Sequence, residues 1–138
     1  MTYCLAIKVK DGLVFASDSR TSAGVDYVSV YSKMHTFQLK EGRVFVLLSA
    51  GNLATSQAVV NALRRDLADP EAPVSLNSVH FPFDAAHYIG EISVRVQNEH
   101  PEVMKKSGVN VEASFILGGQ IGLGEHEIYL IYPQGNYI

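Results

Sequence analysis

The chain has 138 residues, of which 47% are hydrophobic and 18% are charged, and its formal net charge is −3. This composition predicts a single folded domain and excludes a disordered chain, and the scattered Lys and Arg residues argue against a nucleic-acid-binding surface. No apolar run approaches the roughly 20 residues that cross a bilayer, and no secretory signal precedes the first strand. The single cysteine, Cys4, excludes an internal disulfide, so we expect a reducing compartment, the cytoplasm.

The first part of the chain predicts a β-hairpin. Every second residue from Tyr3 to Val9 is a large apolar side chain, and this period of two is typical of a strand with two different faces. Asp11 and Gly12 predict a tight turn, after which residues 13–17 return as a second strand.

The predicted hairpin brings Thr2 close to Asp18. If Met1 is removed, Thr2 carries a hydroxyl and a free α-amine on one residue. The pKa of an α-amine is near 8, so part of it is neutral at physiological pH and can accept the hydroxyl proton. Thr2 would then be a nucleophile that has its own base.

The middle of the chain predicts three further strands. Residues 25–31 and 36–39 are extended, and a turn at Glu41 and Gly42 follows them. The run at residues 44–48 is apolar on both faces, which is typical of a central strand that is covered on each side.

Two helices are predicted next. The first begins after Asn52 as N-cap and ends at Asp69 and Pro70. Residues 70–82 contain three prolines and predict a loop. Asp84 is expected to cap the second helix, which ends before Pro101. Its apolar face consists of Ala85, Tyr88, Ile89, Ile92 and Val96.

The chain then returns to strands. Residues 111–117 and 127–132 are predicted strands, and the glycine-rich residues 118–124 between them are expected to form a hairpin turn. A further turn at residues 133–136 leads into the beginning of another strand. Two adjacent helices between sets of strands favour an α+β fold of stacked layers. Because the last hairpin is incomplete, we expect the chain to be truncated at the C-terminal side of its domain.

Four residues have the chemistry of a hydrolytic site. Thr2, Asp18 and Lys33 are the right types for a nucleophile, an orienting acid and an electrostatic partner. Gly51, at a strand-to-helix junction, could offer its backbone N–H to an oxyanion. Two of these residues also have an ordinary interpretation. Asp18 could cap a turn, and Lys33 could be a solvated surface lysine.

Several separate stretches resemble one family. In several motifs and in their order, the chain is similar to a proteasome β-type subunit, and more closely to Anbu, a bacterial proteasome-like group. These motifs are Thr2 with its apolar strand, then DGLVFASDSRTSAG, SKMHTF and VFVLLSAGNLATSQ. The resemblance implies an N-terminal-nucleophile hydrolase fold, a four-layer αββα sandwich of antiparallel sheets. It implies a threonine peptidase acting on peptide or unfolded protein substrates, and self-assembly into a ring or stack.

The resemblance also assigns roles. It implies that Thr2 is the nucleophile, Asp18 its acidic partner and Lys33 the catalytic lysine, with Gly51 as the oxyanion glycine. Residues expected to bind substrate by strand addition are Arg20, Thr21 and Ser22. No cofactor, metal, nucleic acid or membrane partner is expected, and no particular ATP-dependent unfoldase is indicated.

Two other functions stay open at this stage. While Met1 is retained, the Thr2 nitrogen is an amide and cannot act as a base, which favours an inactive assembly or scaffold subunit. A different N-terminal-nucleophile amidase, acting on small amides, would use the same residues.

Overall fold

The computed structural model describes residues 1–22 and 28–138. Its helices and strands, in chain order, are β1 (Cys4–Val9), β2 (Gly12–Ser17), β3 (Arg20–Ser22), β4 (Val28–Val30), β5 (Met34–Gln38), β6 (Arg43–Gly51), α1 (Leu53–Ala68), α2 (Pro82–Glu99), α3 (Glu102–Lys106), β7 (Ala113–Ile121) and β8 (Glu127–Ile131). The predicted strand at residues 25–31 coincides with β4 at its end, and residues 25–27 lie outside the described residues.

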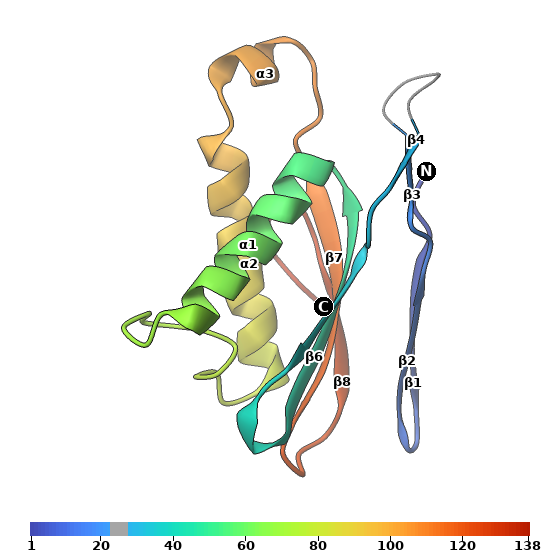
Figure 1. Cartoon of the computed structure of the whole chain (residues 1–138), viewed down its shortest axis with the longest axis vertical. Coiled ribbons are helices and arrows are strands. Elements are labelled where there is room, and N and C mark those ends of the chain that lie inside the picture. The colour runs from blue at the N-terminus through green and yellow to red at the C-terminus, as the bar shows by residue number, and fades with distance from the viewer. Residues whose placement is uncertain (23–27) are drawn as a thin grey trace.

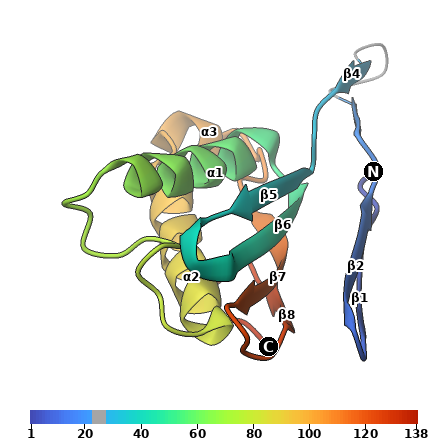
Figure 2. The same cartoon turned by 60° about the horizontal axis from the view of Figure 1, so that its bottom comes forward.

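These elements form three layers (Figure 1). Helices α1 and α2 cover one face of a four-stranded antiparallel sheet, and the β1–β2 hairpin lies on the other side of that sheet. Figure 2 shows the same order of layers from a second direction. The α+β class with antiparallel sheets is confirmed, and the described residues form one helical layer and two layers of strands (Figure 1), which is consistent with part of the predicted αββα sandwich.

The four-stranded sheet has the order β5-β6-β7-β8, so β6 and β7 are its central strands. They pair over nine residues, from Arg43 opposite Ile121 to Gly51 opposite Ala113. The prediction that residues 44–48 form a central strand is therefore correct.

The core lies between this sheet and the helices. The apolar side chains buried there at the centre of the fold are Phe45, Leu47, Val59, Leu63, Ile89, Phe115 and Leu117. Helix α1 begins as predicted, because the Asn52 side chain accepts a hydrogen bond from the Thr55 N–H at 3.0 Å.

The β1–β2 hairpin packs on the sheet by its inner face only. A Cβ atom at Gly118 would lie 2.1 Å from Phe15 Cζ. The Phe15 ring therefore fits against β7 only because position 118 has no side chain. The opposite face of the hairpin is apolar and exposed to solvent. Its members are Tyr3, Leu5, Ile7, Val9 and Val14.

The predicted turn of this hairpin is wrong by one residue. Val9 pairs with Gly12, so the two turn residues are Lys10 and Asp11. Gly12 is the first residue of β2, and its φ angle is not positive. A turn without positive φ does not need glycine, which is why the Asp-Gly pair predicted the wrong position for this turn.

Asp84 is not the N-cap residue of the second helix, but its side chain takes part in the capping box at the start of that helix. Helix α2 begins at Pro82, and Asp84 is its third residue. The carboxylate reaches back and accepts a hydrogen bond from the Phe81 N–H at 3.1 Å. Pro82 starts the helix because its fixed φ suits the first helical position, and the predicted loop ends one residue sooner than expected.

The glycine-rich turn is also placed too early. Gly118 and Gly119 belong to β7, and the turn begins after Ile121. Two aromatic rings, Phe15 and Phe45, occupy the space where Cβ atoms at Gly118 and Gly119 would lie. These glycines therefore serve close packing and not a change of direction. The strand begins at Ala113, later than predicted, and the short helix α3 was not predicted.

Candidate active site

The start of β1 is held against Asp18 by two hydrogen bonds. The Tyr3 N–H donates to Asp18 Oδ1 at 2.7 Å, and the Asp18 N–H donates to the Tyr3 carbonyl at 3.0 Å. Thr2 directly precedes Tyr3, so the hairpin fixes the beginning of the chain beside this carboxylate.

Lys33 is buried and paired. Its Nζ atom donates to Asp18 Oδ2 at 2.7 Å and to the Arg20 carbonyl at 2.7 Å, and the residue is only 7% exposed. The hydrogen bond from Lys33, followed by that from the Tyr3 N–H, lowers the pKa of Asp18 from its ordinary value. A buried ammonium requires such partners, so Lys33 is not a solvated surface lysine.

Gly51 ends β6 with a φ of +103°, a conformation that favours glycine. A Cβ atom there would lie 2.5 Å from the Glu112 carbonyl oxygen. The Ser49 N–H donates to the Lys33 carbonyl, and the Asn52 N–H donates to the Glu112 carbonyl on the opposite side. Because N–H groups alternate along a strand, the Gly51 N–H points to the Lys33 side.

One small cavity joins these elements. It has a volume of about 100 Å³, and its lining includes Thr2, Lys33 and Gly51. Asp18 does not line the cavity, but it forms an ion pair with Lys33, which does. The structure thus brings together the predicted nucleophile, lysine and oxyanion glycine around one cavity. The predicted acid, Asp18, is hydrogen-bonded to the lysine.

The three residues expected to bind substrate lie on β3. Arg20 and Thr21 line the same cavity, whereas Ser22 does not. In the backbone, Arg20 pairs with Val30 and Ser22 with Val28, so β4 occupies one edge of this strand. Within the described part of the chain no strand pairs with the other edge. The Thr21 hydroxyl is buried and has no hydrogen-bond partner there.

Two serines of the cavity were not predicted. Ser49 and Ser56 are both buried and line it beside Lys33. Ser49 lies on β6 two residues before Gly51, and Ser56 lies one turn into α1. The sequence shows their spacing from Gly51, but an isolated serine is not part of a recognisable motif and so did not indicate a role in the site.

Cys4 lies close to Thr2 between the two sheets. Its Sγ donates to the Ser49 carbonyl at 3.6 Å, and burial raises the pKa of the thiol. Thr2, Cys4 and Ser49 also border a second cavity of about 200 Å³. A thiol held in its protonated form is a poor nucleophile, so Thr2 is the better candidate.

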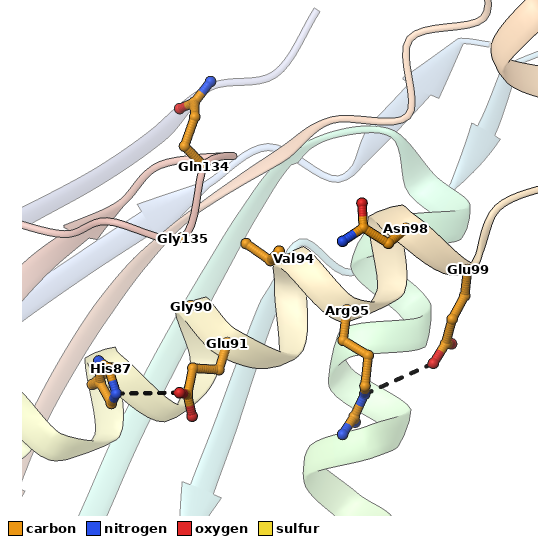
Figure 3. A pocket seen from close by; sticks show the side chains of 9 residues that line it. All are labelled: His87, Gly90, Glu91, Val94, Arg95, Asn98, Glu99, Gln134 and Gly135. Atoms are coloured by element: carbon orange, nitrogen blue, oxygen red, sulfur yellow. Dashed lines mark ion pairs between the residues drawn. The ribbon is translucent and has the colours of Figure 1, made fainter.

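A larger cavity of about 590 Å³ opens on the outer side of α2 (Figure 3). His87 and Glu91 form a contact of 3.4 Å there, and Arg95 and Glu99 one of 3.9 Å. Each contact joins residues four positions apart on one helix, a pattern common on solvated helix surfaces. None of the predicted site residues lines this cavity.

Among residues 1–22 and 28–138, no group of three or more His, Cys, Asp or Glu side chains could hold a metal ion. In the same residues, no helix has both the length and the apolar character needed to cross a membrane.

No protein-family model matches the chain, and no curated protein does. Solved structures do match it over its whole length. Anbu (ancestral beta-subunit) from Yersinia bercovieri is 42% identical with a TM-score of 0.87. The helical assembly of the Anbu complex from Pseudomonas aeruginosa is 38% identical with a TM-score of 0.87, and an Anbu (Gly-1) mutant from Hyphomicrobium sp. strain MC1 is 36% identical with a TM-score of 0.86.

All of this chain is covered in each comparison, whereas the chain spans only 56%, 56% and 54% of those three proteins, respectively. The likeness therefore extends to every element described above, including those that line the small cavity.

Proposed function

Because this chain belongs to the Anbu family of proteasome-like β-subunits, we propose that it is a threonine-type peptidase subunit with Thr2 as its nucleophile. The observation that carries the proposal is the ion pair of the buried Lys33 with the partly exposed Asp18, beside a cavity that Lys33, Thr2 and Gly51 line. Activity requires removal of Met1, because only then is the Thr2 amine free to accept a proton.

The proposed reaction has two steps. The Thr2 hydroxyl attacks the substrate carbonyl while its own amine takes the proton, and the bond to the leaving amine breaks after that proton is returned to it. Water then attacks the resulting ester and releases the acid. The Lys33 ammonium favours the neutral form of the Thr2 amine, and the Gly51 N–H binds the carbonyl oxygen when it becomes negative.

Substrate would bind as an added strand. The edge of β3 that β4 leaves free carries Arg20 and Thr21 along the cavity, so an extended peptide could pair with its backbone. The buried, unpartnered Thr21 hydroxyl supports this proposal, since a polar group of the substrate would satisfy it.

We also propose that the subunit works as a homo-oligomer in the cytoplasm. The Pseudomonas aeruginosa relative forms a helical assembly, and the single cysteine of this chain suits a reducing compartment. We further propose that residues 1–138 are one part of a single domain, in keeping with the fraction of the related proteins that they span.

The test is the Thr2→Ala variant of the full chain, with removal of Met1 verified by intact-mass measurement. We expect hydrolysis of fluorogenic peptides to fall by on the order of 10³-fold or more, because the nucleophile is lost. Thr36→Ala is the matched control, since Thr36 lies on β5 and does not line the cavity, and it should keep full activity.

Unchanged hydrolysis by Thr2→Ala would reject the proposal. An oligomeric parent protein that hydrolyses neither peptides nor small amides would favour the scaffold function. Turnover of small amides without turnover of peptides would favour an amidase.

A further inference from the structure

The segment that precedes β7 is tied to the first turn of α1 immediately beside Gly51. Three successive backbone carbonyls of this segment accept hydrogen bonds from two residues of that turn. Asn52 Nδ2 donates to the Asn110 carbonyl at 3.0 Å, and the Asn52 N–H donates to the Glu112 carbonyl at 2.8 Å. The carbonyl between them, that of Val111, accepts from Thr55 Oγ1 at 2.7 Å.

His100 completes this arrangement from the end of α2. Its Nε2 lies 2.7 Å from Thr55 Oγ1, and Thr55 is fully buried. A hydroxyl has one proton, and here that proton goes to the Val111 carbonyl, which can only accept. His100 Nε2 must therefore carry a proton and donate it to Thr55 Oγ1.

Gly51 is in direct contact with the segment that these bonds hold. The Glu112 carbonyl oxygen and Ala113 Cα occupy the space where a side chain at Gly51 would begin, at 2.5 Å and 3.0 Å from an ideal Cβ. A shift of residues 110–112 would therefore displace the backbone at Gly51, whose N–H points to the Lys33 side. Figure 1 shows the connection from α3 to β7 passing beside the beginning of α1.

We propose that Thr55 and His100 are positioning residues for the oxyanion-binding N–H of Gly51. The inference rests on the proposed peptidase function for its catalytic consequence, but the structural coupling stands apart from it. Neither side chain lines the small cavity. They act by holding residues 110–112, and through them the backbone at Gly51.

The kinetic test is Thr55→Val, which keeps the shape of the side chain and removes the hydroxyl. We expect kcat for peptide hydrolysis to fall by about 10- to 100-fold with KM nearly unchanged, because the oxyanion forms only in the transition state. His100→Leu should show the same pattern, and His100→Gln, which keeps an N–H donor, should restore part of kcat.

The matched control is Ser93→Ala. Ser93 is also a fully buried hydroxyl, and it accepts a hydrogen bond from Gln97 on α2, away from Gly51. This variant should lose thermal stability to a similar extent while keeping kcat. If Thr55→Val and Ser93→Ala lowered kcat equally, Thr55 would have only a structural role and the inference would be wrong.

A second measurement does not depend on activity. In the Thr2→Ala background, Thr55→Val should raise the amide hydrogen exchange of peptides that contain Gly51 and residues 110–112, and Ser93→Ala should not. If exchange rises but the parent protein hydrolyses nothing, the coupling holds and the peptidase proposal fails. If exchange and kcat both stay at the parent level, the positioning inference fails whether or not the protein is a peptidase.

Discussion

Lys33 is the residue on which the electrostatics of the candidate site depend. Its ammonium is almost fully buried, yet it has two oxygen partners, Asp18 Oδ2 and the Arg20 carbonyl, both at 2.7 Å. Asp18 in turn accepts the Tyr3 N–H. One carboxylate therefore fixes both the lysine and the beginning of β1, so its charge state should matter for stability and for the placement of Thr2.

This dependence gives a prediction for pH. The pKa of Asp18 is lowered by folding, so its contribution to stability is complete above its ordinary value of 3.8 and is lost as the pH falls through the lower folded-state value. We expect Asp18→Asn to be less stable than the parent near pH 7, and the difference to shrink below about pH 4. Urea unfolding midpoints measured across this range test it.

Asp11→Asn is the control for that series. Asp11 is a turn residue of the β1–β2 hairpin and forms no ion pair with Lys33. The Asp11→Asn substitution removes the same negative charge at a position outside the candidate site. A difference between parent and Asp18→Asn that stayed constant down to pH 2 would show that ionisation of Asp18 contributes nothing to folding.

The sequence could suggest Thr2, Asp18, Lys33 and Gly51, because their types and order match a known family. It could not show that Lys33 also donates to the Arg20 carbonyl, since that bond depends on how β3 lies relative to the residue that precedes β5. It also gave no sign of the bond between Thr55 and His100, which are 45 positions apart. The contact between Thr55 and His100 follows from the packing of α1 against α2 and not from any local pattern.

At the scale of elements, the glycines of β7 show why local patterns fail. Gly118 and Gly119 read as a turn, yet they lie within a strand where Phe15 and Phe45 need the space above them. The rings that decide this come from β2 and β6, far away in sequence. The start of α1 and the strand alternation, by contrast, were predictable because they depend on neighbouring residues.

The same feature predicts the effect of a single methyl group. In Gly119→Ala the new Cβ would lie 2.5 Å from Cδ1 of the fully buried Phe45, so we expect a loss of about 1–3 kcal/mol in the free energy of unfolding. Thermal or urea unfolding measures it. The control is Gly12→Ala, where no atom lies within 4 Å of the added carbon.

Gly12→Ala should be neutral or slightly stabilising, because it only reduces the freedom of the unfolded chain. If both variants lost the same free energy of unfolding, the loss at Gly119 would come from the change in backbone freedom and not from contact with the Phe45 ring.

At the scale of the whole molecule, the β1–β2 hairpin has an exposed apolar face. Ile7 and Val14 are paired across the two strands and are 44% and 54% exposed. A contiguous apolar face of this kind binds hydrophobic dyes and promotes association. We expect the chain of residues 1–138, produced by itself, to bind such a dye, and the double variant Ile7→Thr, Val14→Thr to bind much less.

Val103→Thr is the control for the dye experiment. Val103 is more exposed than either of those residues but lies on α3, away from the hairpin. Dye fluorescence should therefore stay at the parent level in this variant. A parent chain that bound no dye would show that the hairpin face is too small or too irregular to act as one surface.

The pairing of β6 with β7 has a consequence for the order in which the molecule folds. Residues that face each other in these strands are on the order of 60 to 80 positions apart in the chain, whereas the two strands of the first hairpin are neighbours in sequence. Local pairs close quickly and distant ones slowly, since a long loop must first lose its freedom. Gly51 pairs with Ala113, which is far away in the chain, so its surroundings should form later than the first hairpin. If the proposed peptidase function holds, a newly made chain would have Thr2 in place before the N–H of Gly51, and it would not cleave neighbouring chains during synthesis.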